Sequence, residues 1–70
     1  MKVHESFTLP EELYKMLREL RHQLSEENLA EISRSRLYRV LLYFAFKMWQ
    51  ARKMTLADFR RLERELEGLE

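Results

Sequence analysis

The feature that most constrains this chain is the segment Leu37–Trp49, which is apolar on nearly every side when it is wound into a helix. Within it only Arg39 and Lys47 are charged. A helix that is apolar all round has to be buried on all sides. The whole chain has 70 residues, and a domain of that size buries only about 60% of the surface of its unfolded chain. One copy is too small to enclose this helix, so the sequence predicts a homodimer.

Composition excludes several other ways of stabilising or using a small chain. With no cysteine, the chain has neither disulfides nor the thiolates on which most small zinc-stabilised folds depend. One glycine is too few for a phosphate-binding loop. The longest apolar run covers 13 residues, whereas about 20 are needed to cross a bilayer. We therefore expect no cofactor, no metal site and no contact with a membrane. No arrangement of nucleophile, base or paired carboxylates indicates an enzyme. The N-terminus lacks the apolar core of a signal peptide, so a cytoplasmic protein is expected.

The single proline, Pro10, separates a short N-terminal segment from the rest of the chain. Before it, Val3, Phe7 and Leu9 fall on one side of a two-residue alternation, which predicts a β-strand. No later segment has the pattern of a strand. Either this segment is a frayed tail or it pairs with the same strand of a second subunit, and the alternation favours pairing.

Three helical segments follow. The first is expected from about residue 10 to residue 24, and its apolar face consists of Leu13, Met16, Leu17, Leu20 and Leu24. Residues 25–32 form an acidic connector that is either irregular or contains an extra helical turn. Ser33 has the character of an N-cap for the second helix.

The third helical segment begins at Thr55, where Asp58 completes the pattern of a capping box, and Gly68 suits its end. No proline or glycine separates it from the second helix, so one long helix and a bend near residues 53–55 are both compatible with the sequence. We divide the chain into a core domain, residues 1–54, and a C-terminal helical extension, residues 55–70. The apolar stripe of that extension comprises Leu56, Phe59, Leu62, Leu66 and Leu69.

The net charge of +1 conceals a strongly uneven distribution. Residues 1–32 sum to −3, residues 33–54 to +6 and residues 55–70 to −2. The middle segment contains no acidic residue at all. Its first two cations, Arg34 and Arg36, lie at the start of a helix, where free backbone N–H groups attract anions. This combination indicates a phosphate-binding site, although basic residues that merely keep an apolar helix soluble are the ordinary alternative.

The order of these elements resembles the ribbon-helix-helix repressors of the Arc/MetJ/CopG type. The resemblance rests on the motif Thr-Leu-Pro-Glu-Glu-Leu at residues 8–13 and on Ile-Ser-Arg-Ser-Arg-Leu at residues 32–37, and it covers about residues 2–50. It implies a mainly α fold with one N-terminal strand pairing across an intertwined homodimer, two core helices and, here, an additional third helix. It also implies a sequence-specific transcriptional regulator that inserts an antiparallel β-ribbon into the major groove of double-stranded DNA.

The resemblance assigns roles to three sets of residues. The base-reading strand face corresponds to Lys2, His4, Ser6 and Thr8. The phosphate-binding turn corresponds to Ser33, Arg34 and Ser35, and the charge distribution adds Arg36 to it. The expected dimer core consists of Phe7, Leu9, Leu37, Val40, Leu41, Phe44 and Met48.

A second hypothesis is an antitoxin-like or other protein-interaction module that binds a partner protein through residues 55–70. It is motivated by Glu5, which stands where members of the family usually place an apolar residue, and by the absence of Arg and Lys between His4 and Thr8. The third helix then has three possible roles: enlarging the core of its own dimer, binding a partner protein, or driving higher assembly on DNA.

Overall fold

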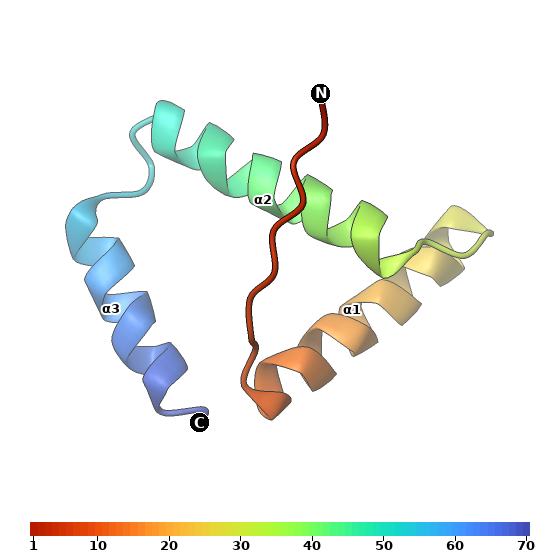
Figure 1. Ribbon diagram of the computed structural model, residues 1–70, viewed down its shortest axis with the longest axis horizontal. Coiled ribbons are helices and arrows are strands. Elements are labelled where there is room, and N and C mark those ends of the chain that lie inside the picture. Colours follow the sequence, from red (N-terminus) through yellow and green to blue (C-terminus); the bar gives the residue numbers. More distant parts are fainter.

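The computed structural model describes all 70 residues and contains three helices and no strand. Helix α1 spans Glu11–Asn28, α2 spans Arg34–Gln50 and α3 spans Leu56–Glu67. In Figure 1, α1 and α2 pack at an angle, the N-terminal segment passes across α2, and α3 turns away beyond the end of α2. The expectation of a mainly α chain with three helices is confirmed.

The predicted N-terminal strand is wrong, and with it the ribbon-helix-helix fold. Residues 1–9 have no regular secondary structure and take part in no backbone hydrogen bond. A strand exists only through the ladder of hydrogen bonds to a neighbour. No other segment of this chain is extended over a comparable length, so within one chain the alternation of Val3, Phe7 and Leu9 has no partner to pair with.

Helix α1 begins where the sequence predicts, directly after Pro10, but it ends four residues later than expected. Pro10 is its N-cap, and Glu11 and Glu12 lie in the first turn, close to the positive end of the helix dipole. The carboxylates of both contact the Lys15 ammonium, at 3.5 and 3.9 Å. The acidic residues of the connector continue the helix to Asn28. Leu29 then ends it in the left-handed region, with φ 59° and ψ 20°.

Helices α2 and α3 are separate, so the bend is the correct one of the two alternatives. The chain leaves α2 through Ala51 and reverses at Arg52, whose φ of 59° is incompatible with a continuing helix. Helix α3 then starts with the predicted capping box. The Thr55 hydroxyl accepts from the Asp58 N–H at 3.2 Å, and the Asp58 carboxylate accepts from the Thr55 N–H at 2.9 Å. Gly68 ends the helix with an ordinary right-handed conformation.

The core of a single chain is very small. Leu37 on α2 is the only buried residue, α1 and α2 are the only helices that pack on each other, and α3 packs against neither of them. The chain exposes 6714 Å², whereas a compact monomer of 8.7 kDa exposes roughly 4,700 Å². Each chain therefore leaves about 2,000 Å² more in water than a compact fold of its mass.

Much of this excess surface is apolar. Large apolar side chains of α2 that are more than half exposed are Val40, Leu42, Tyr43, Phe44, Phe46 and Trp49. The apolar stripe of α3 is exposed as well, from Leu56 to Leu69. None of the three helices combines the length and apolar character that a bilayer span requires.

Candidate nucleic-acid interface

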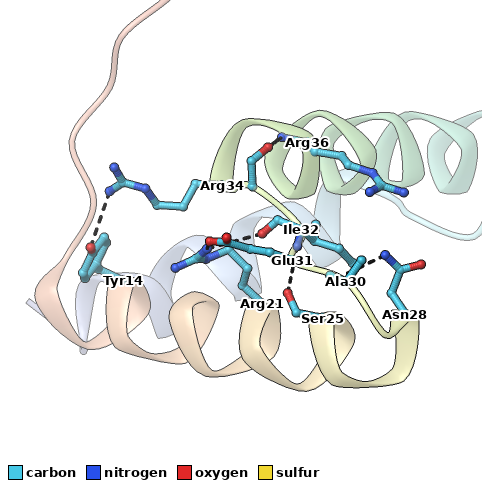
Figure 2. A network of polar contacts seen from close by, with 10 residues as sticks. Tyr14, Arg21, Ser25, Asn28, Ala30, Glu31, Ile32, Arg34 and Arg36 are labelled. Atoms are coloured by element: carbon cyan, nitrogen blue, oxygen red, sulfur yellow. Dashed lines mark hydrogen bonds and ion pairs between the residues drawn. The ribbon is translucent and has the colours of Figure 1, made fainter.

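The turn between α1 and α2 is held by side chains of α1, and this fixes where α2 begins. The Ser25 hydroxyl accepts a hydrogen bond from the Ile32 N–H at 2.9 Å. One turn before Ser25 on α1, Arg21 donates to the Ile32 carbonyl at 3.3 Å and contacts the Glu31 carboxylate at 3.5 Å. Figure 2 shows two of these contacts meeting at Ile32, the residue that directly precedes Ser33, and the third at the neighbouring Glu31. The Arg21 side chain is only 19% exposed, so its contact with the turn is partly shielded from water.

Ser33 opens α2 as its N-cap, as predicted. Its backbone is extended, with φ −71° and ψ 157°, and its hydroxyl accepts from the Arg36 N–H at 3.1 Å. The Ser33 carbonyl accepts from the Leu37 N–H at 3.0 Å. The N–H groups of Arg34 and Ser35 have no acceptor within the chain. Two backbone donors at the positive end of a 17-residue helix therefore face solvent.

The arginines beside these donors point in different directions. Arg34 donates to the Tyr14 hydroxyl at the long distance of 3.5 Å, which draws its guanidinium toward the start of α1. Arg36 lies on the opposite side of the turn, and its guanidinium makes no hydrogen bond (Figure 2). One turn further along, the Arg39 Nε donates to the Ser35 carbonyl at 3.3 Å. All three guanidinium groups remain on the exposed surface.

No cation of residues 33–54 forms an ion pair. The ion pairs of the chain involve Lys15 and Arg21 on α1 and Arg61 on α3, each with a carboxylate of the same region. An exposed cation placed near a helix N-terminus without a carboxylate is unfavourable unless an anion compensates it. The charge is thus left free to attract an external anion. The unpaired cations are Arg34, Arg36, Arg39, Lys47, Arg52 and Lys53.

The N-terminal segment lies beside this helix and brings part of the expected base-reading set to it. Lys2, His4, Ser6 and Thr8 are all exposed. An open groove of about 560 Å³ is lined on the N-terminal side by Lys2, His4 and the acidic Glu5 and on the α2 side by Ser35 and Arg39. Ser6, Thr8, Arg34 and Arg36 lie outside this groove, so the structure unites the two expected sets only in part.

The predicted dimer-core residues divide into two groups. Leu37 is buried, and Leu9, Leu41 and Met48 are half-buried. Phe7, Val40 and Phe44 are about 60% exposed, so the chain covers less than half of each side chain.

Sequence reasoning missed three residues that build the turn: Arg21, Ser25 and Tyr14. Their contacts join positions 7 to 20 residues apart, and no local pattern reveals such pairings. Arg39 was counted among the cations but not assigned to the site. Its spacing four residues after Ser35 on one helix was the available signal.

Two further observations concern ligands and relatives. No group of three His, Cys, Asp or Glu side chains comes together in a way that could hold a metal ion. The carboxylates and imidazole of Glu19, His22 and Glu26 share one exposed hollow on α1 with the cationic side chains of Lys15 and Arg18. Comparison with protein-family models, with curated proteins and with solved structures found no match.

Proposed function

We propose that this chain is a homodimeric, sequence-specific DNA-binding protein that regulates transcription. The observation that carries the proposal is the start of α2. There, two unsatisfied backbone N–H groups lie beside the exposed guanidinium groups of Arg34 and Arg36, and neither arginine forms an ion pair. Backbone donors, the helix dipole and arginine are the groups that bind phosphate oxygens in proteins.

Repetition of the charge along α2 supports DNA over a small anion. Six unpaired cations between residues 33 and 54 give this part of the chain a charge of +6, and a dimer doubles it. Double-stranded DNA presents a phosphate charge for each roughly 1.7 Å of its axis, so it rewards an extended set of cations. One small anion can neutralise only the few groups that it touches.

The exposed apolar surface supports the homodimer. An excess of about 2,000 Å² per chain amounts to about 4,000 Å² in a pair, which falls within the range of obligate dimer interfaces. The side chains of Val40 and Phe44 follow Leu37 at helical spacing, so they extend the one buried position of the chain into a continuous apolar face. A second copy of the same face is self-complementary under two-fold symmetry.

The polar residues of the N-terminal segment are proposed to distinguish one DNA sequence from another. This segment lies against the first turns of α2. Lys2 and His4 border the groove that also contains Ser35 and Arg39. Together with Ser6 and Thr8, these side chains provide donors and acceptors for base edges, whereas the α2 turn contacts phosphates and sets the position of the protein on the duplex.

The test is a salt series of DNA binding, measured by fluorescence anisotropy on a labelled duplex of mixed sequence. The full chain is compared with the double variant Arg34→Ala/Arg36→Ala and with the control Arg60→Ala/Arg64→Ala on α3. Each phosphate contact contributes about 0.9 to the slope of log K against log salt. If four arginines of the dimer each contact one phosphate, the double variant lowers the slope by about 3.6, and the control leaves it unchanged.

Two results would contradict the proposal. One is a full chain that binds no duplex even at low salt, and the other is a control variant that lowers the slope as much as the α2 variant does. A separate selection from a pool of random duplexes tests the base-reading assignment. Ser6→Ala and Thr8→Ala are expected to change the selected sequence while leaving the salt slope unchanged.

The competing function is recognition of a partner protein through residues 55–70. It is favoured by one observation, the exposed apolar stripe of α3, which contacts neither α1 nor α2. A purified chain that fails to bind DNA, and that remains monomeric with α3 exposed, would support this candidate instead.

A further inference from the structure

Helix α3 is well formed at its ends but lacks the packing that a short helix needs. Its capping box makes both reciprocal hydrogen bonds, yet it has only 12 residues and touches no other helix. Isolated helices of this length are marginal in water, because most helical stability in proteins comes from a packed apolar face. Its own stripe is exposed along its whole length, from 57% at Leu56 to 37% at Leu66. Another surface must therefore cover it for the helix to persist.

Helix α2 offers an apolar surface that its own chain and a simple α2–α2 contact leave open. Val40 and Phe44 belong to the face of Leu37, which the proposed dimer buries. Leu42, Phe46 and Trp49 follow the i, i+4, i+7 spacing of a different face, and they are between 53% and 63% exposed, with Leu42 also lining the groove beside the N-terminal segment. One partner helix covers only one side of α2, so this second face requires another element.

The end of this second face is hollowed. A partly open hollow of about 610 Å³ lies at the junction of α2 and α3, with Phe46 and Trp49 on one side and Met54 and Leu56 on the other. It has the size and apolar lining to accept large side chains such as Phe59 and Leu62 from another chain.

The distribution of charge indicates which element covers the second face of α2. Helix α2 carries four cations and no acid, whereas residues 55–70 carry a net charge of −2. Two copies of residues 55–70 packed on each other bring together two segments with the same net charge, but this segment packed on α2 brings opposite net charges together. The loop that precedes α3, residues 51–55, already directs it away from its own α1 and α2.

We infer that α3 is exchanged between protomers: its apolar stripe packs on the Leu42–Phe46–Trp49 face and in the junction hollow of a second copy. Two-fold symmetry makes the exchange reciprocal, so both stripes and both second faces are covered together. This inference rests on the proposed homodimer, and it is independent of whether that dimer binds DNA.

The test uses the full chain with a photo-crosslinking benzoylphenylalanine in place of Phe59. Chains of ordinary isotope content are mixed with ¹⁵N-labelled chains, irradiated, digested and analysed by mass spectrometry. We expect crosslinks from position 59 to residues 42–56, with peptide pairs of mixed isotope content that mark an inter-chain contact. The same photoreactive group at Arg64, on the polar face of α3, is the control and is expected to yield no such pairs.

A charge on the stripe provides a second readout. Phe59→Asp is expected to raise the dimer dissociation constant at least about tenfold, because a buried aromatic anchor is replaced by a carboxylate, whereas Arg64→Ala leaves it unchanged. A dimer whose crosslinks from position 59 are absent or confined to one chain overturns the exchange and leaves the homodimer standing. A chain that is monomeric throughout overturns both. DNA binding by the dimer decides the proposed function separately.

Discussion

Phe44 gives the sharpest prediction about dimerisation, because it is both central to α2 and uncovered. It is 60% exposed in one chain. A phenylalanine buries about 150–250 Å² when it is fully covered, so a partner removes on the order of 100 Å² of Phe44 from water. At about 25 cal/mol per Å², this is about 2.5 kcal/mol per chain and about 5 kcal/mol for the two copies of a dimer.

Phe44→Ala is therefore expected to weaken the dimer by about 4 kcal/mol, since alanine retains only a small part of the apolar contact. This corresponds to a rise of about 1,000-fold in Kd. Sedimentation equilibrium over a range of protein concentrations measures this change. A parallel series of thermal melts checks it, because the Tm of an obligate dimer rises with concentration.

Leu29→Ala is the matched control, since Leu29 is 92% exposed but belongs to the connector and not to the face of Leu37. Its Kd is expected to equal that of the unaltered chain. If Phe44→Ala leaves Kd within about threefold of the unaltered value, a change of well under 1 kcal/mol, then the dimer does not form through the face of Leu37. The same holds for a full chain whose Tm is independent of concentration.

Three further perturbations test separate parts of the structure. Leu29→Gly is expected to raise Tm by several degrees, because a φ of 59° costs a leucine about 1 kcal/mol and costs glycine nothing. An unchanged or lower Tm in a thermal melt would contradict this expectation. Ser25→Ala removes the acceptor of the Ile32 N–H, so it is expected to lower the free energy of unfolding by about 1 kcal/mol and to weaken DNA binding. A variant that loses this stability but keeps full DNA affinity would show that the turn does not position the DNA-binding residues. Acidification is expected to fray α3, because hydrogen bonds from the backbone N–H and the hydroxyl of Thr55, with the charge of Arg61, hold the pKa of Asp58 below its ordinary value. This contribution is complete above the unfolded pKa of about 3.9 and is lost as pH falls through the lower folded pKa, so helical circular dichroism should decline below about pH 4 and Asp58→Asn should abolish that part of the response.

Local chemistry made the helices predictable, and the absence of local chemistry made the N-terminal segment misleading. Ser33 and the pair Thr55 and Asp58 mark the starts of α2 and α3 by hydrogen bonds that span three residues, which a sequence displays directly. The alternation before Pro10 has no such internal support. A two-residue period describes how a segment would pair, but it supplies no partner, and this chain contains none.

The site was predictable in its charge but not in its construction. The segment sum of +6 and the N-cap placed the cationic turn at Ser33–Arg36. The hydrogen bonds from Arg21 and to Ser25 that set the position of that turn depend on how α1 folds back on the connector. Such contacts across a reversal of the chain follow from three-dimensional packing, which neither periodicity nor spacing encodes.

The most direct measurement of the central claim follows the backbone amide signals of the full chain by NMR while a DNA duplex is added. The amides of Arg34 and Ser35, which have no acceptor in the free chain, are expected to show the largest downfield shifts as phosphate oxygens bind them. Reversal of these shifts by added salt is expected as well. Shifts concentrated on α3, with the start of α2 unmoved, would contradict the central claim.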